Sequence, residues 1–140
     1  MPRKKFDLSL LPPAPDLTHE LELWQAGVQI VAGVDEAGRG ALAGPVAAGV
    51  VVLPNQHDLP QVLAGVRDSK QMTAKERQYW ATQIELSALA YQVGFAGPEE
   101  VDELGIVPAT RLAAMRAIEA IRRAARSTAA SVYCRSTYSK

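Results

Sequence analysis

The sequence contains a single cysteine, two histidines and no net charge. Because Cys134 has no second cysteine to pair with, neither a disulfide framework nor a cysteine-based zinc site can form, and a reducing compartment is expected. His19 and His57 are isolated and lack the spacing of metal ligands, so we interpret both as exposed structural residues. Lys and Arg number 15, as do Asp and Glu, so contact with nucleic acid requires a local basic patch.

Long hydrophobic runs are also absent. The longest, residues 46–53, has the length of a strand and is far shorter than a membrane span. The N-terminus starts with basic residues, but an acid and three prolines over residues 7–15 prevent the apolar segment of a signal peptide. We therefore expect a cytoplasmic protein with no membrane contact, and no obligate protein partner is evident. The 140 residues, 48% of them hydrophobic, are enough for one domain with a core.

Turn and cap residues divide the first half of the chain. Residues 1–15, with their basic start and prolines, are expected to form a flexible leader. The elements expected after it are a helix capped by Asp16 and stopped by Gly27, a strand over residues 29–34, a glycine-rich turn over 38–45 and a strand over 46–53. Two strands joined so closely predict a hairpin.

The second half of the chain begins with a poorly defined connection over residues 56–66. Thr73 and Glu76 have the spacing of a capping box, which predicts a helix. A third strand is expected over residues 90–96, with helices starting at Pro98 and Pro108. The side chains that we assign to apolar faces or to the core are Trp24, Trp80, Ile84 and Ala88, and, recurring every three residues, Leu112, Met115, Ile118 and Ile121.

Two adjacent acids, Asp35 and Glu36, follow the first expected strand and precede the glycine turn. The simplest interpretation is a solvated strand end with two incidental acids. However, neighbouring carboxylates repel each other unless a cation or a change of protonation relieves them. Mg²⁺ and Mn²⁺ prefer oxygen ligands of this kind, and a strand end beside a glycine turn is typical of phosphate-handling sites. The pair therefore predicts a metal site.

The glycines of the turn allow a second interpretation, a nucleotide-cofactor site. Gly38, Gly40 and Gly44 give the spacing G-x-G-x-x-x-G, which differs from the dinucleotide fingerprint G-x-G-x-x-G. The fingerprint also requires a helix directly after the glycines, whereas a valine-rich strand follows here. Asp58 lies about 20 residues on, where a ribose-binding acid is expected, but it lies in a loop. No Gly-Lys-Ser/Thr follows, so the turn is not a Walker loop, and we favour the metal site.

The residues from Gly33 to Gly40, Gly-Val-Asp-Glu-Ala-Gly-Arg-Gly, and their continuation through Val46 resemble the N-terminal signature of the ribonuclease HII family. Weaker blocks follow in the family's order, and they are Asp68-Ser69-Lys70 before a capped helix, residues 98–104 and residues 109–119. Taken without the resemblance, Asp68-Ser69-Lys70 is explained equally well as a polar helix leader. The resemblance covers residues 21–121.

The resemblance implies an α/β chain with a ribonuclease H-like fold, in which a three-stranded antiparallel start leads into a mixed sheet flanked by helices. It also implies an endonuclease that uses Mn²⁺ or Mg²⁺ to hydrolyse RNA in RNA–DNA hybrids and ribonucleotides embedded in a DNA duplex, leaving a 3′-hydroxyl and a 5′-phosphate. By the same resemblance, the catalytic metal ligands would be Asp35 and Glu36, the ribose-sensing loop Gly38, Arg39 and Gly40, and the phosphate-binding residues Ser69 and Lys70.

The chain departs from the family pattern near its C-terminal end. The family's site needs two more aspartates, but no Asp or Glu occurs after Glu119, and neither Tyr133 nor Tyr138 can be assigned to the family's substrate-contacting tyrosine. We therefore expect a partial ribonuclease H-like domain over residues 16–125, an atypical Ser/Thr-rich tail over residues 126–140, and a missing C-terminal part. The alternative function is that of a truncated, inactive remnant that binds hybrids.

A basic helical stretch lies either near nucleic acid or on a solvated face, and it comprises Arg111, Arg116, Arg122, Arg123 and Arg126.

Overall fold

The computed structural model describes residues 15–126 and 133–134. Its elements in chain order are α1 (Thr18–Gln25), β1 (Val31–Ala37), β2 (Val46–Val52), α2 (Leu59–Val62), the 3₁₀ turn η2 (Ser69–Gln71), α3 (Ala74–Ser87), β3 (Ala90–Ala96), α4 (Pro98–Leu104), α5 (Ile106–Arg126) and β4 (Tyr133–Cys134). Most of the expected leader and most of the expected tail, including Tyr138, lie outside the described residues. Within the described part of the chain, no helix is both long and apolar enough to cross a membrane.

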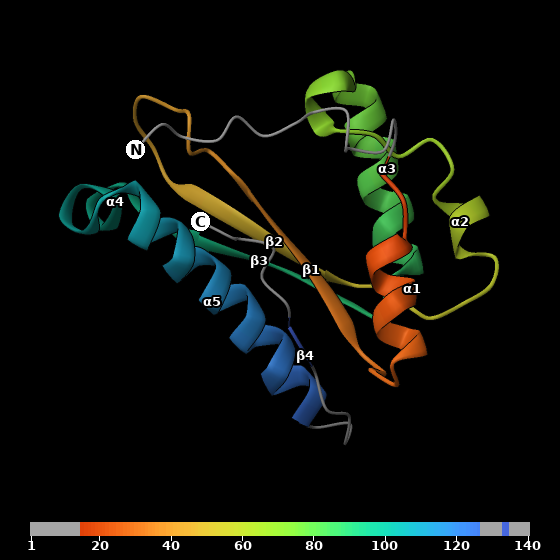
Figure 1. Ribbon diagram of the computed structural model, residues 1–140. Helices are drawn as coiled ribbons and strands as arrows, with labels where there is room; N and C mark the ends of the chain where they lie inside the picture. Colours follow the sequence, from red (N-terminus) through yellow and green to blue (C-terminus); the bar gives the residue numbers. More distant parts are fainter. Residues whose placement is uncertain (1–14, 127–132, 135–140) are drawn as a thin grey trace, which may run out of the picture.

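The four strands form one sheet in the order β3-β2-β1-β4 (Figure 1). β1 pairs antiparallel with β2, from Ala32 opposite Val52 to Ala37 opposite Ala47, which confirms the predicted hairpin. β2 in turn pairs antiparallel with β3, whereas β4 pairs parallel with β1 on its other side. The expected architecture, three antiparallel strands that lead into a mixed sheet with helices beside it, is therefore present.

β1 extends further than the sequence predicts. The expected strand stops at Val34, before the acidic pair, but β1 continues through both acids to Ala37. The reason is tertiary: β2 runs alongside for the whole length, so that Asp35 lies opposite Gly49 and its backbone has a pairing partner. The acidic pair therefore belongs to the strand itself, one residue before the turn begins.

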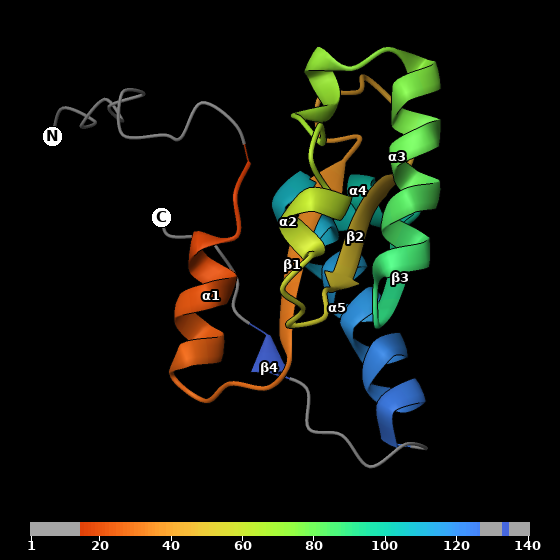
Figure 2. The same cartoon turned by 90° about the vertical axis from the view of Figure 1, so that its right-hand side faces the viewer.

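α5 packs along one face of the sheet, over β2 and β3 (Figures 1 and 2). The predicted every-third-residue stripe is buried only in part: Ile121 is buried, Leu112 and Ile118 are half-buried against the core, and Met115 is 67% exposed. The fully buried side chains on α5 are the small ones at a spacing of four, Ala109, Ala113 and Ala117, followed by Ile121. Small residues are needed because β3 and α5 approach so closely that a Cβ added at Gly94 would fall on the backbone of Ala113.

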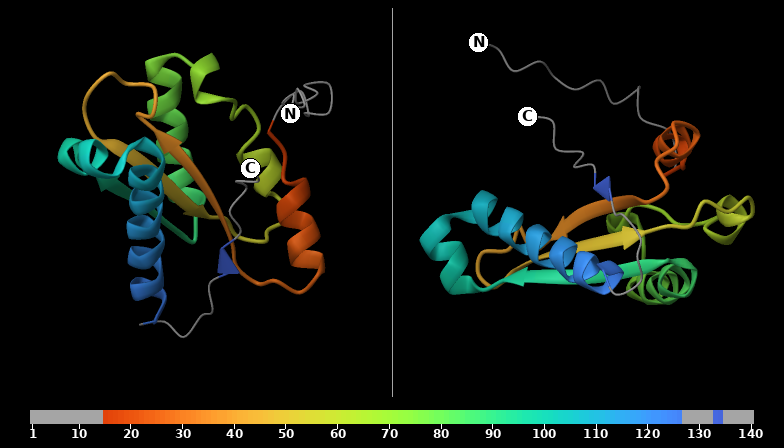
Figure 3. Two further views of the ribbon diagram at one scale, coloured as in Figure 1. Left: turned by 60° about the vertical axis from the view of Figure 1, so that its left-hand side comes forward. Right: turned by 90° about the horizontal axis from the view of Figure 1, so that it is seen from below.

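Helices α1, α2 and α3 lie on the other side of the sheet from α5 (Figures 2 and 3). Trp24 of α1, Val31 of β1 and Leu59 of α2 form a buried cluster there, which confirms the core position of Trp24. Trp80 of α3 is only half-buried, and no residue of α3 is fully buried. The helix itself begins as predicted, because the capping box is present, but its apolar face packs less tightly than expected.

An ion pair joins α4 and α5 at the end of β3. The Glu100 carboxylate accepts hydrogen bonds from Arg116 Nη1 and Nη2 at 2.7 and 2.6 Å, and also from the backbone N–H of Gly97 at 2.9 Å. Arg116 Nη1 donates in addition to the Phe95 carbonyl at 2.7 Å. These hydrogen bonds, chiefly those from Arg116, lower the pKa of Glu100 from 4.5 to about 2.

This ion pair predicts a pH-dependent contribution to stability. Because the pKa of Glu100 is lower in the folded than in the unfolded chain, its stabilising effect is complete above pH 4.5 and is lost as the pH falls towards 2. Glu100→Gln should therefore lower the melting temperature at pH 7, and the difference from the original chain should shrink below pH 4.5. Thermal unfolding over this pH range measures the effect, with exposed Glu99→Gln on the same turn as the control. A difference that stays constant with pH would contradict the assignment.

Candidate active site

The two acids of β1 do not lie on the same face of the sheet. Successive side chains of a strand alternate between faces, so Asp35 and Glu36 diverge. The Asp35 side chain is exposed, and its Oδ1 accepts the Glu36 backbone N–H at 2.9 Å. Glu36 is half-buried and its Oε1 accepts a hydrogen bond from Arg39 Nη1 at 3.0 Å. The repulsion expected from the sequence is thus relieved within the chain, by the alternation and by the Arg39 guanidinium.

The donor atoms of this pair suit a hard divalent ion. Both side chains offer carboxylate oxygens, and Mg²⁺ is commonly held by one or two carboxylates together with water and substrate phosphates. Over residues 15–126, no group of three or more His, Cys, Asp and Glu side chains gathers in a way that could hold a metal. Asp35 and Glu36 therefore offer the kind of oxygen ligand that such an ion prefers, from opposite faces of β1.

The glycine turn that follows β1 contains two kinds of glycine. Gly38 has a φ of +94°, and an added Cβ would lie 2.8 Å from the carbonyl oxygen of Pro45, so the turn itself requires glycine there. Gly40 differs, because its φ is not positive and an added Cβ would meet no atom within 4 Å. The described fold therefore leaves open space at position 40, as it does at Gly33 and Gly49.

The second predicted segment forms the 3₁₀ turn η2 just before α3. Asp68 precedes this turn, and its Oδ1 accepts the Lys70 backbone N–H at 2.8 Å. The side chains of Ser69 and Lys70 are exposed. Figures 1 and 2 place η2 and the glycine turn at the same end of the molecule, although the two segments stand apart in Figure 1. The fold thus presents both predicted binding segments at one end.

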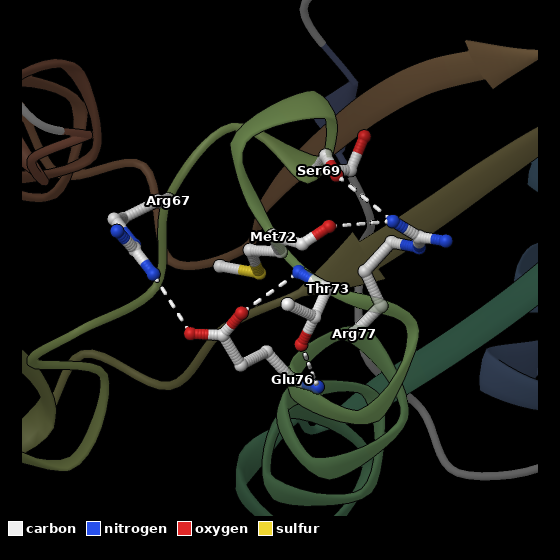
Figure 4. Close-up of polar contacts among 6 residues, drawn as sticks. All are labelled: Arg67, Ser69, Met72, Thr73, Glu76 and Arg77. Carbon is white, nitrogen blue, oxygen red and sulfur yellow. Dashed lines mark hydrogen bonds and ion pairs between the residues drawn. The ribbon is translucent and has the colours of Figure 1, made fainter.

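Sequence reasoning missed two residues that hold this second segment, Arg67 and Arg77, and Figure 4 shows them with the capping Glu76. Arg67 Nη2 donates to Glu76 Oε1 at 2.8 Å, and Arg77 Nη1 donates to the Met72 carbonyl at 2.7 Å. The pKa of Glu76 is lowered, first by the hydrogen bond from the Thr73 backbone N–H and also by Arg67. The available signal was the spacing: Arg77 lies four residues after the capping Thr73, on the face that meets the preceding loop.

The other polar residues singled out from the sequence lie away from these segments. His19 and His57 are exposed, as predicted, and Asp58 precedes α2 without capping it through its side chain. Within the basic stretch of α5, Arg116 binds Glu100, and Arg123 Nε lies 3.5 Å from Glu119 Oε1. The positive charge of this stretch is therefore partly neutralised.

Comparisons of the sequence with known proteins find the same family by two routes, a family model and individual relatives. The sequence model of the family described as ribonuclease HII matches residues 32–137, beyond residue 121 where the resemblance was expected to end. Ribonuclease HII of Synechococcus sp. (strain JA-3-3Ab) is 52% identical over 104 residues, which are 74% of this chain and 47% of that protein. Ribonuclease HII of Desulfitobacterium hafniense (strain DSM 10664 / DCB-2) is 45% identical over 106 residues, 76% of this chain and 39% of that protein.

Among solved structures, ribonuclease H2 from Pyrococcus horikoshii OT3 is 39% identical, with a TM-score of 0.47, over 53% of this chain and 35% of that chain. The chain spans less than half the length of the two curated relatives described above.

Proposed function

This chain belongs to the ribonuclease HII family, and we propose that it acts as an endonuclease on the RNA strand of RNA–DNA hybrids and on ribonucleotides embedded in DNA. The proposed reaction is divalent-metal-dependent hydrolysis of a phosphodiester bond that leaves a 3′-hydroxyl and a 5′-phosphate. The observation that carries the proposal is the end of the first hairpin, where two carboxylates of β1 run directly into a glycine turn. The α/β sheet of the described residues agrees with the ribonuclease H-like fold of this family.

We propose that Asp35 and Glu36 hold Mg²⁺ or Mn²⁺ together with water and a phosphate of the substrate. When bound, such an ion supplies Lewis-acid stabilisation of charge and a water of lowered pKa. The chain's own contribution is to place the carboxylates. β1 fixes Asp35 through its pairing with β2, and the Glu36 backbone N–H donates to Asp35 Oδ1, which leaves the second carboxylate oxygen for a ligand.

We also propose that Gly38, Arg39 and Gly40 recognise the ribose. The 2′-hydroxyl is the group that distinguishes RNA from DNA, and a backbone can reach it only where no Cβ intervenes. The open space beside Gly40, where an added Cβ would meet no atom within 4 Å, leaves its backbone accessible to a ligand and supports this role. Ser69 and Lys70, exposed on η2, would hold a backbone phosphate, which positions the duplex without reading its sequence.

Gly40→Ala tests the ribose-recognition proposal. The Cβ meets nothing within 4 Å, so the melting temperature should not fall. The added methyl group would, however, hold the 2′-hydroxyl of the ribose away from the turn. Loss of one hydrogen bond between the turn and this hydroxyl should weaken binding of the duplex about tenfold. Dissociation constants are compared for two duplexes that differ only by one ribonucleotide, at a single salt concentration. The all-DNA duplex is the control, since its affinity should not change. Equal weakening for both duplexes would argue against ribose recognition at this position.

A second candidate function is hybrid binding without cleavage. It is favoured by one observation, that Ser69 and Lys70 are exposed and can meet a nucleic-acid backbone whether or not a metal is bound. Incubating the 140-residue chain with Mn²⁺ or Mg²⁺ and a duplex that contains one ribonucleotide separates the two candidates. Cleavage beside the ribonucleotide supports the endonuclease, and selective binding without cleavage supports the second function. Binding of a free nucleotide with no preference for hybrids would instead support a nucleotide-cofactor protein.

A further inference from the structure

The loop before α3 is held by two neighbouring side chains from the first turn of that helix (Figure 4). We call residues 67–73 the phosphate segment. Glu76 binds its two ends, because Oε1 accepts from Arg67 Nη2 at 2.8 Å and Oε2 accepts from the Thr73 backbone N–H at 2.7 Å. Arg77 binds its middle, because Nη1 donates to the carbonyls of Met72 at 2.7 Å and of Ser69 at 3.4 Å. The whole segment is thereby tied to α3.

The contacts of Arg77 bear directly on the two residues assigned to phosphate binding. Its guanidinium donates a long hydrogen bond, 3.4 Å, to the carbonyl of Ser69, and the N–H of the same peptide group, that of Lys70, donates to Asp68 Oδ1 at 2.8 Å. Met72, 7% exposed, anchors the C-terminal end of the turn in the protein. The backbone that carries the Ser69 and Lys70 side chains is therefore held from both sides, while the side chains themselves remain exposed.

We propose that Arg77 is a positioning residue for phosphate binding: it acts through the backbone of the phosphate segment and fixes where Ser69 and Lys70 meet the nucleic acid. This inference rests on the proposed role of Ser69 and Lys70. Arg77 Nη1 points its hydrogen bonds into the chain, towards two carbonyls, rather than outwards to a ligand. Pre-organisation of this kind raises affinity because the loop does not have to be ordered when the duplex binds.

The salt dependence of binding distinguishes positioning from direct contact. Each phosphate that a cation neutralises contributes about one unit to the slope of log K against log [salt]. The probe is a DNA duplex with one embedded ribonucleotide, bound by the full chain in metal-free buffer. The variants are Lys70→Ala, Arg77→Gln and the double variant. Lys75→Gln is the matched control, because it removes one positive charge from the same helical turn at an exposed position outside the contacts of Glu76 and Arg77.

If Arg77 acts through Lys70, Lys70→Ala and Arg77→Gln should each reduce the salt slope by about one unit and weaken binding about tenfold. The double variant should then show the same slope and affinity as either single variant. Lys75→Gln should stay close to the original chain. Circular dichroism and melting temperature establish that the variants are folded. An Arg77→Gln variant with the original slope and affinity overturns the inference, and so does a double variant that loses two units, because that result means direct phosphate contact by Arg77.

Failure of the proposed function gives a different pattern. If Lys70→Ala leaves both the slope and the affinity unchanged, phosphate binding by Lys70 is wrong, and the positioning role of Arg77 is wrong with it. If Lys70→Ala weakens binding and Arg77→Gln does not, the phosphate site stands and only the positioning role is wrong.

Discussion

Gly94→Ala is expected to destabilise the fold more than alanine at any other glycine of the described residues. β3 and α5 touch through their backbones at this point: the new Cβ would fall on the Ala113 carbonyl oxygen and lie 2.8 Å from the Ala117 nitrogen. Backbone atoms cannot rotate aside as a flexible side chain can, so α5 would have to move off the sheet. Overpacking of this kind costs about 3 kcal/mol or more in the free energy of unfolding. Urea unfolding followed by circular dichroism measures the loss.

Gly49→Ala is the matched control for this experiment. Gly49 lies in β2, opposite Val93 of the neighbouring strand β3. An added Cβ at Gly49 meets nothing within 4 Å, so the change should alter stability by about 1 kcal/mol or less. Equal unfolding midpoints for the Gly94→Ala and Gly49→Ala variants would show that β3 and α5 do not approach as closely as the structure has them.

Asp35→Asn is expected to have the largest effect on activity. The side chains have the same shape, and the asparagine Oδ1 can still accept the Glu36 N–H, so the strand should be preserved. What is lost is the negative charge that a divalent ion requires. Removing an indirect partner of a bound metal already costs up to about a hundredfold in affinity or activity, and loss of a direct ligand, the role proposed for Asp35, should cost at least as much. The measurements are Mn²⁺ binding by electron paramagnetic resonance and cleavage of a duplex with one ribonucleotide.

Asp102→Asn provides the control for charge alone, because Asp102 is an exposed acid on α4. This variant should bind Mn²⁺ and cleave as the original chain does. Binding of the duplex in metal-free buffer should be retained or strengthened in Asp35→Asn, since one negative charge near the phosphates has been removed. Unchanged Mn²⁺ affinity in Asp35→Asn would rule out a metal-binding role for Asp35.

The features that the sequence predicted correctly are local ones. The capping box of Thr73 and Glu76 involves residues three apart, so its spacing alone indicated the start of α3. The β1–β2 hairpin followed from two apolar segments around a glycine turn. The family block around Asp35 was equally readable, because its residues are contiguous.

The features that the sequence did not predict depend on residues far apart in the chain. β1 continues past Val34 because β2 pairs with it, which no property of Asp35 or Glu36 indicates. The buried alanines of α5 were overlooked because larger apolar residues at a spacing of three gave a stronger pattern, whereas Gly94 leaves room only for small ones. Arg77 was missed for a different reason: its partners, the carbonyls of Met72 and Ser69, lie only five and eight residues away, but they are backbone atoms, so the spacing of Arg77 from Thr73 was the one signal in the sequence.

The antiparallel arrangement of β1, β2 and β3 under α5 has a consequence for how the chain folds. β1 packs on β2, which follows it closely, and β3 packs on α5, which follows it closely, whereas residues 46–52 of β2 pair with residues 90–96 of β3 across the long segment between them. Contacts between near neighbours close short loops and form early. During synthesis, the hairpin, β3 and α5 can therefore assemble as soon as they leave the ribosome, with the acidic pair and the glycine turn already in place before the parallel strand arrives.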